Sequence, residues 1–250
     1  MDLREVTGNI RRHPWEITRA KTLMCILEKE LPMERELNVL DLGCGDAYIL
    51  TSLSERFNLK SYHGVDINLS DQQIEKLSIP ERNILFHNNY KFLKKLDFDL
   101  ILALDVIEHV ENDHDFIATV VQNYIADKTK LLLTAPAYNF LFSSHDIVLG
   151  HYRRYNLKKL NQIIFSNHLR SISSGYIFFS LVPIRFITVL YEKIFNPDKP
   201  GKKGAGHWIH GVFISKIMEC LLSFDNKISL KLSSMGIKLP GLTVWTLSGK

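Results

Sequence analysis

The stretch from residue 38 to residue 50 constrains the fold more than any other part of this sequence. It reads Asn-Val-Leu-Asp-Leu, then Gly-Cys-Gly, then Asp-Ala-Tyr-Ile-Leu. The first five residues are typical of a short buried strand, the glycines of a tight turn, and the last five of the start of a helix. A strand that leads through a glycine turn into a helix forms the nucleotide-binding corner of a doubly wound α/β sheet. We therefore expect an α/β fold with a ligand at this corner.

The side chains around the turn indicate the charge of that ligand. A dinucleotide-binding fingerprint needs a third glycine three positions after Gly45, and this sequence has none there. Two acids, Asp41 and Asp46, flank the turn. Carboxylates suit a ligand with positive charge and hydroxyl groups better than a pyrophosphate. Gly43 and Gly45 let a ligand approach the backbone closely, and Asp46 is also expected to cap the helix that follows.

The pattern hydrophobic-Asp-x-Gly-x-Gly resembles motif I of the class I S-adenosylmethionine (SAM)-dependent methyltransferases. The resemblance implies SAM as the cofactor and S-adenosylhomocysteine (SAH) as its product. It also implies that Asp41, Gly43, Gly45 and Asp46 contact the cofactor. The alternative is a glycine turn without a ligand, which the residues at the later strand ends disfavour.

The second expected strand, Ser61 to Val65, ends at another acid. Asp66 follows it directly, and an acid at this place can accept hydrogen bonds from both ribose hydroxyls. The resemblance supports that role and implies that Ile67 lies against the adenine. The alternative role for Asp66 is the N-cap of the helix that begins near Asn68.

The third expected strand, Asn83 to His87, is followed by Asn88 and Asn89. In the methyltransferase family an aspartate near this place commonly receives the adenine amino group. An asparagine carbonyl can accept the same hydrogen bond, so we expect one of these two residues to bind adenine. The alternative is that both residues only form a turn.

The fourth expected strand, Phe98 to Leu104, is almost continuously apolar, as a central parallel strand should be. The resemblance implies that Leu104 lies beside the methionine part of the cofactor. The next residues, Asp-Val-Ile-Glu-His-Val, resemble the corresponding motif of the branch that includes ubiquinone and small-molecule O-methyltransferases. His109 could act there as a general base. The alternative is that Glu108 and His109 only fix the following loop through hydrogen bonds.

A stretch rich in chemically active side chains, residues 140–155, follows the fifth expected strand. We expect it to be a loop over the ligand end of the sheet. The expected bases are His145 and His151, and the expected acceptor-binding residues are Tyr152, Arg153 and Arg154, because paired arginines can grip a carboxylate or phosphate. The pattern H-D-x-x-x-G-H-Y-R-R-Y resembles a bacterial subgroup of class I methyltransferases associated with cell-envelope glycan and lipid pathways. The alternative is a loop held by internal salt bridges, with Tyr152 and Tyr155 in the core.

The remaining patterns complete a Rossmann-like, doubly wound, mostly parallel seven-stranded sheet. We expect a single domain over residues 1–250, with a helical cap (1–37), a core (38–180), a helical insertion (181–241) and a last, antiparallel strand (242–250). The further expected helices cover residues 13–31, 46–57, 69–77, 113–126 and 156–167, and the further strands cover 130–134, 171–179 and 242–247.

The insertion holds two apolar segments, 181–195 and 208–224, joined by the basic segment 196–206. One interpretation is an interfacial hairpin that makes peripheral membrane contact through residues 181–224. A second is a dimerisation arm that would make the protein a homodimer. A third is a helical lid packed on the sheet and the substrate.

The charge is distributed unevenly. Residues 1–150 contain 16 Lys and Arg against 23 Asp and Glu, whereas residues 151–250 contain 15 against 4. A basic half favours an anionic partner: a phosphate-bearing substrate, a membrane surface or a nucleic acid. Many base-methylating enzymes carry Asn/Asp-Pro-Pro-Tyr/Phe after the fourth strand, where this sequence has Asp-Val-Ile-Glu, and this difference disfavours a nucleic acid.

The three cysteines have no C-x-x-C spacing, and no histidine cluster stands beside them in the sequence. This pattern favours a reducing compartment and predicts no metal. The polar N-terminus does not resemble a signal peptide. We expect a cytoplasmic protein and leave open a place at the inner face of the membrane.

The sequence therefore predicts transfer of the SAM methyl group to an oxygen or nitrogen atom of an anionic acceptor. That acceptor would be a small molecule or lipid-linked, in cell-envelope glycan or lipid biosynthesis. The alternatives are a SAM-binding interaction protein that transfers no methyl group and, with less support, a nucleic-acid methyltransferase.

Overall fold

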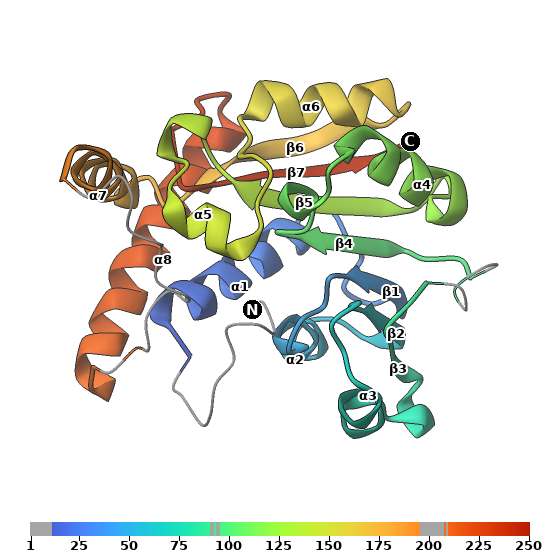
Figure 1. Ribbon diagram of the computed structural model, residues 1–250. Coiled ribbons are helices and arrows are strands. Elements are labelled where there is room, and N and C mark those ends of the chain that lie inside the picture. Colours follow the sequence, from blue (N-terminus) through green and yellow to red (C-terminus); the bar gives the residue numbers. More distant parts are fainter. Residues whose placement is uncertain (1–11, 91–92, 94–95, 196–207, 209) are drawn as a thin grey trace.

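The computed structural model describes residues 12–90, 93, 96–195, 208 and 210–250. A seven-stranded sheet forms its centre, in the order β3-β2-β1-β4-β5-β7-β6 (Figure 1). The strands are β1 (Leu37–Leu42), β2 (Leu59–Val65), β3 (Ile84–His87), β4 (Leu100–Leu104), β5 (Lys130–Pro136), β6 (Arg170–Ile177) and β7 (Thr243–Gly249). Strands β1 to β5 pair in parallel, and β7 runs antiparallel to both β5 and β6. The expected Rossmann-like, mostly parallel seven-stranded sheet is confirmed.

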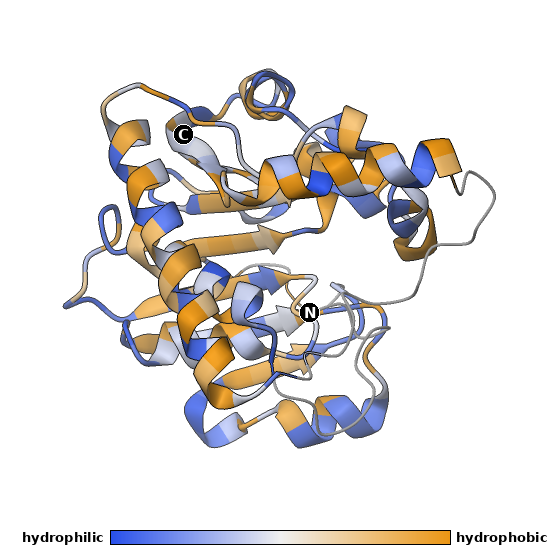
Figure 2. Ribbon diagram, turned by 90° about the vertical axis from the view of Figure 1, so that its left-hand side faces the viewer, coloured by the Kyte–Doolittle hydropathy of each residue, from blue (hydrophilic) through white to orange (hydrophobic). Residues whose placement is uncertain are grey.

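Helices cover both faces of the sheet (Figure 1). The α-helices are α1 (Pro14–Leu27), α2 (Tyr48–Ser54), α3 (Asp71–Leu77), α4 (Asp113–Tyr124), α5 (Ser144–Leu149), α6 (Leu157–Ser166), α7 (Leu181–Phe195) and α8 (Val212–Ser234). Short 3₁₀ helices are η2 (Pro80–Arg82), η4 (Ile107–His109) and η5 (Asn139–Leu141). Figure 2 shows apolar residues along much of the sheet, whereas most helices alternate between apolar and polar residues. This is the pattern of a sheet buried between two helical layers.

The central strand β4 shows why the core has two halves. Its side chains alternate between the two faces, as in any strand. Ile101 and Ala103 belong to the apolar cluster under α4 and α6. Leu100 and Leu102 belong to the cluster under α1, α2 and α8. All four side chains are fully buried, so β4 is the apolar centre of both halves.

The second half of α8 is fixed to the sheet by buried polar side chains. Asn226 accepts a hydrogen bond from the backbone N–H of Phe178 at 2.8 Å and donates one to the Thr22 hydroxyl of α1 at 2.9 Å. Asp225 accepts hydrogen bonds from the backbone N–H groups of Phe179 and Ser180 at 3.2 and 3.1 Å. These bonds satisfy the backbone where β6 ends, so this part of the expected insertion belongs to the packed core.

Two local expectations were wrong. The helix after β1 begins at Tyr48, so its N-cap is Ala47, in the left-handed region (φ 60°), and not Asp46. Asp46 still accepts a long hydrogen bond from the Tyr48 N–H at 3.4 Å, and it pairs with Arg12 of the N-terminal segment. The expected loop after β5 contains helix α5, because Ser143 and Asp146 form a capping box and Gly150 ends the helix at φ 73°. The basic segment 196–206 lies outside the described residues, as do residues 1–11.

Candidate functional site

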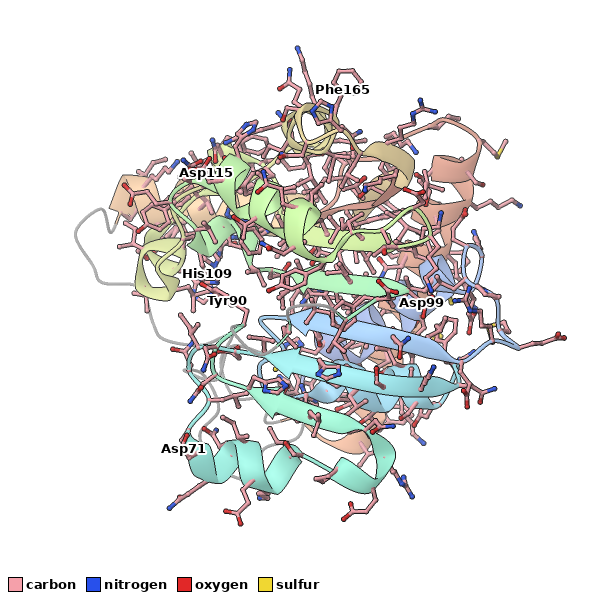
Figure 3. The ribbon with its side chains drawn as sticks, turned by 90° about the vertical axis from the view of Figure 1, so that its right-hand side faces the viewer. Asp71, Tyr90, Asp99, His109, Asp115 and Phe165 are labelled. Atoms are coloured by element: carbon pink, nitrogen blue, oxygen red, sulfur yellow. The ribbon has the colours of Figure 1, made fainter. Side chains whose placement is uncertain are left out.

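A large cavity opens at the carboxyl ends of β1, β2, β4 and β5. Its volume is about 1020 Å³. Among the lining residues that Figure 3 labels, His109 and Tyr90 lie at the edge where these strands end. Of the residues expected from the sequence, the cavity is lined by Gly43, Asp66, Ile67, Leu104, His109, His145, His151, Tyr152 and Arg154. Residues from three strand ends and from the segment after β5 thus share one space.

The Asp66 carboxylate is oriented by the backbone around it. Oδ2 accepts a hydrogen bond from the Gly45 N–H at 3.1 Å, and Oδ1 accepts one from the Asn68 N–H at 2.9 Å. Oδ1 also accepts a hydrogen bond from the side-chain amide of Asn68 at 3.2 Å. Oδ2 keeps a further lone pair, and displacement of the exposed Asn68 amide would let the carboxylate accept bonds from two vicinal hydroxyls. Ile67 is 75% exposed and lines the cavity beside it, which gives a flat aromatic ring an apolar contact.

Both the backbone conformation and the neighbours of Gly43 exclude a side chain at this position. Its φ is +71°, in the left-handed region, and a Cβ there would lie 2.4 Å from Cγ2 of Val106. Its N–H donates to the Val65 carbonyl at 2.7 Å, which ties the turn to the end of β2. The glycine therefore keeps the floor of the cavity open between β1 and β4.

Asp41 lies behind this floor and is almost completely buried. Burial raises the pKa of its carboxyl to about 7, although the hydrogen bond from the Tyr62 hydroxyl at 2.6 Å opposes that rise. Asp41 and Asp46 line a small adjacent cavity of about 50 Å³. This cavity also touches Gly43 and Leu104, so the two spaces meet at the turn.

Helix α1 and the residue before its cap add charged groups that the sequence analysis missed. Arg12, Glu16 and Arg19 line the small cavity, and the last two also line the large one. Arg19 donates to the Thr134 hydroxyl at 2.7 Å and forms a salt bridge with Asp105 at 2.8 Å. The spacing of three to four residues places these groups on one helix face. That spacing is the sequence pattern from which their shared position could have been predicted.

Three expected residues point elsewhere. Asn88 donates to Asp71 at 3.5 Å, and Asn89 donates to Asn88 at 3.1 Å. Arg153 pairs with Asp113 at 3.0 Å and donates to a backbone carbonyl at 2.6 Å. These three are not among the described residues that line either cavity.

A buried carboxylate organises the segment after β5. Asp146 accepts two hydrogen bonds from Arg154 and lies 2.8 Å from Nδ1 of His151. Burial alone would raise the pKa of Asp146, but the hydrogen bonds from His151 and Arg154 and the charge of Arg154 hold it well below its ordinary value. The sequence analysis did not name Asp146, although it forms the centre of this cluster.

Glu108 lies at the cavity wall and is 1% exposed. Neither carboxylate oxygen has a hydrogen-bond partner among the described residues. Burial, and then the charge of Asp105, raise the pKa of Glu108 well above its ordinary value. The rings of His109 and His151 meet edge to face, with centroids 4.6 Å apart. Potential ligand atoms of Glu108, His109 and His151 lie within 4.8 Å of one another.

Comparisons with known proteins show the family to which this chain is similar. A family model described as a methyltransferase domain matches residues 15–176. The ubiquinone biosynthesis O-methyltransferase of Rickettsia typhi is 31% identical over 126 residues, which cover 46% of this chain and 49% of that protein. N-methyltransferase 4 of Papaver somniferum is 25% identical over 115 residues, which cover 43% of this chain and 32% of that protein. The chain thus spans about half the length, or less, of these curated relatives.

A solved structure agrees at the level of the fold. The SAM-dependent methyltransferase of Mesorhizobium loti superposes with a TM-score of 0.54 at 11% identity, over 93% of this chain and all of that one. At this identity the likeness concerns the fold alone. The family match extends from α1 to β6 and includes the glycine turn, Asp66 and the residues after β4. The chain therefore belongs to the class I SAM-dependent methyltransferase family.

Proposed function

We propose that this protein transfers the methyl group of SAM to an oxygen or nitrogen atom of an acceptor bound in the large cavity. The observation that carries the proposal is the meeting, in one space, of the oriented Asp66 carboxylate and three histidines. Relatives named as O- and N-methyltransferases support the reaction class and leave both acceptor atoms open.

The cofactor roles follow the strand ends. Asp66 accepts bonds from the ribose hydroxyls, and Ile67 packs against the adenine, whose amino group is assigned to Asn88 or Asn89. Gly43 and Gly45 let the cofactor approach the backbone, and Leu104 contacts its methionine part. Asp41 and Asp46 face the positively charged end. To these residues we add Arg19, whose guanidinium suits the methionine carboxylate.

SAM supplies, when bound, a methyl group on a positively charged sulfur that becomes a neutral thioether once the acceptor has taken the methyl carbon. The protein therefore needs mainly to align the acceptor and to exclude water. Apolar lining residues such as Leu104, Val106 and Phe116 support exclusion of water. The acceptor atom must also lose a proton, for which a nearby base is needed when that atom is a hydroxyl oxygen.

The proposed bases are His145, His151 and His109, all at the cavity wall. His151 forms a pair with the buried Asp146, and a carboxylate on one ring nitrogen fixes the tautomer and leaves the other nitrogen as a proton acceptor. The dyad therefore favours His151 as the general base. His109 adjoins it, and His145 reaches the cavity from α5.

We further propose that the acceptor carries a negative charge. Arg154 and Arg185 both line the cavity, although Arg154 also binds Asp146 and Arg185 donates to the Ser143 hydroxyl at 2.6 Å. Two guanidinium groups beside one space support an acceptor with a carboxylate or phosphate. Tyr152 offers a ring and a hydroxyl at the same wall. Arg153 is a weaker candidate for binding the acceptor, because its charge is already paired with Asp113.

Contact with a membrane surface is a further proposal, supported by the exposed apolar side chains of α7 and α8. No helix in the described part of the chain is long and apolar enough to cross a membrane. Helix α7 packs on the segment that lines the cavity, since Glu192 accepts from the Ser144 N–H at 2.8 Å. A lipid-linked acceptor could therefore reach the cavity from this side. A homodimer through the same helices is the alternative.

The test is calorimetric titration of SAM and SAH into the wild type and Asp66→Ala. Loss of the ribose hydrogen bonds should cost roughly 1.5–3 kcal/mol, which is about ten- to more than a hundredfold in affinity. Detection of SAH release with envelope glycans, lipid-linked sugars and small phenols then tests methyl transfer. Binding of SAM without turnover on any acceptor would favour the interaction protein, and absence of binding would reject the cofactor assignment.

A further inference from the structure

We propose that Glu108, His109 and His151 bind one divalent transition-metal ion in the wall of the cavity. Potential ligand atoms of the three side chains lie within 4.8 Å of one another. Small side-chain rotations can bring atoms at such separations onto one ion with bonds of about 2.1 Å. The surroundings of the cysteines predicted no metal. The proposed ligands lie elsewhere, in η4 and in the segment after α5.

The unpartnered carboxylate of Glu108 is an independent observation. Both of its oxygens are buried and meet no hydrogen-bond partner among the described residues, and the side chain is 1% exposed. Buried carboxylates in proteins are almost always paired, hydrogen-bonded or bound to a metal. Arg19 and Arg154 are near enough to act on its charge, but no described hydrogen bond joins either to it. The missing partner is therefore expected inside the cavity.

The surroundings of His151 match those of a metal ligand. Its Nδ1 lies 2.8 Å from the Asp146 carboxylate, which leaves Nε2 as the ligand atom. Metal-binding histidines typically give their other ring nitrogen to a carboxylate that orients the ring. Asp146 is itself held by Arg154 and by the backbone N–H of Ser143, so the orientation is fixed.

The backbone also joins the two segments that carry the ligands. The Tyr152 N–H donates to the carbonyl oxygen of Glu108 at 2.8 Å. This bond places His151 beside Glu108 although 43 positions separate them in the sequence. The pairing is part of the fold and does not depend on an ion, so the ligands are preorganised.

The ligand types indicate which ion fits. Two imidazoles and one carboxylate suit Zn²⁺, Fe²⁺, Co²⁺ or Mn²⁺ better than Mg²⁺ or Ca²⁺, which prefer oxygen ligands. Three protein ligands leave positions on the cavity side open, as in catalytic sites. A hydroxyl bound there would have a lowered pKa, and its proton would pass to another base such as His145, because Nε2 of His151 would then hold the ion. That last consequence depends on the proposed methyl transfer, but binding of the ion does not.

The test is titration of Co²⁺ into chelator-treated protein, followed by visible absorption and calorimetry. The wild type should bind one equivalent, and Glu108→Gln and His151→Gln should each weaken binding by about 10- to 100-fold or more. Glu111→Gln and His168→Asn change an exposed acid and an exposed histidine and should leave binding unchanged. They control for adventitious surface binding. Circular dichroism identifies any variant that fails to fold, and His109→Gln then replaces it.

Zn²⁺-dependent thermal stability provides a second readout, since an ion that binds the folded state raises its melting temperature. The proposal is overturned if the wild type binds no Co²⁺ and gains no stability from Zn²⁺, or if the ligand variants bind as the wild type does. Titration of SAH into the same samples separates the two proposals. If the wild type binds SAH but no ion, only the metal-site proposal is rejected. If it binds the ion but not SAH, only the proposed methyl transfer is rejected.

Discussion

Arg154 grips Asp146 through two parallel hydrogen bonds, from Nε to Oδ1 at 2.8 Å and from Nη2 to Oδ2 at 3.0 Å. Both side chains are buried, so the pair is shielded from solvent. The pair closes the segment that carries α5 over the cavity, and it orients His151 on the other side of the carboxylate. Positioning of the proposed base therefore depends on a buried ion pair.

Asp146→Asn should destabilise the protein strongly, because it leaves the Arg154 charge buried without its partner. The expected loss is about 3–5 kcal/mol in the free energy of unfolding, measured by urea denaturation. Asp127→Asn changes an exposed carboxylate and should alter stability by less than about 0.5 kcal/mol. Replacement of both partners by apolar residues, Asp146→Leu with Arg154→Met, should restore part of the loss. Equal stability of Asp146→Asn and the wild type would show that the pair is not stabilising.

The buried Asp41 should make stability depend on pH. Its pKa is about 7 in the folded protein and about 3.9 in the unfolded chain. Between these values the folded state holds a proton that the unfolded chain has released, so the free energy of unfolding should fall as the pH rises from about 4 to 7. Urea denaturation at several pH values measures this slope. Asp41→Asn should flatten it, and an unchanged slope in that variant would assign the effect to other groups.

The strands and the ligand corner could be predicted from the sequence because they depend on short-range patterns. The continuous apolar run of β4 and the glycine turn before α2 are local signals, and both led to the correct sheet. Leu104 and Asp66 follow strands directly, so their place at the cavity follows from the direction of the strands.

The Asp146 cluster and the contacts of Arg19 on α1 could not be predicted in the same way. Asp146 lies in a stretch that reads as a loop, and only its bonds with Arg154 and His151 show that it is buried. Arg19 reaches Thr134 and Asp105 from a helix far away in the sequence. The spacing of residues within one element does not reveal such contacts between elements. The N-cap of α2 was misassigned for a related reason. Ala47 holds the cap position, and Asp46 accepts from the Tyr48 N–H and also pairs with Arg12.

Gly43→Ala should damage both folding and cofactor binding. The left-handed φ of +71° costs a residue with a side chain about 1–3 kcal/mol, and the new Cβ would meet Val106 Cγ2 at 2.4 Å. Combination with Val106→Ala removes the contact but not the backbone cost, so the double variant should recover only part of the loss. Gly211→Ala has no heavy atom within 4 Å of its new Cβ and is the matched control. Thermal melts and SAH titration measure the two effects.

Arg19→Gln should weaken SAH binding because the proposed contact to the methionine carboxylate is lost. A hydrogen bond to a charged group contributes about 1.5–3 kcal/mol, so the expected loss in affinity is about 10- to 150-fold. Adenosine, which lacks that carboxylate, should bind the variant and the wild type equally. Lys21→Gln, on the same helix but paired with Glu219 at the surface, is the control. Equal losses for SAH and adenosine would show that Arg19 acts on the shape of the site instead.

The apolar side chains on α7 and on the first half of α8 are unusually exposed for a protein surface. Eight of them are more than half exposed: Ile184, Ile187, Tyr191, Ile194, Phe195, Val212, Phe213 and Leu221. The segment that joins the two helices, 196–206, is basic. Apolar side chains beside lysines suit a surface of anionic lipids.

Phe213→Ser should therefore weaken binding to vesicles that contain phosphatidylglycerol by about tenfold, since loss of a buried Phe side chain costs about 1.5 kcal/mol or more. Sedimentation of the protein with vesicles measures the change. Phe165→Ser, on α6 and 79% exposed, removes an equally exposed ring elsewhere (Figure 3) and should leave binding unchanged. Vesicles of neutral lipid should bind more weakly than anionic ones, because the lysines then have no partner. If Phe213→Ser instead changes only the sedimentation coefficient of the protein without lipid, these helices form a dimer interface.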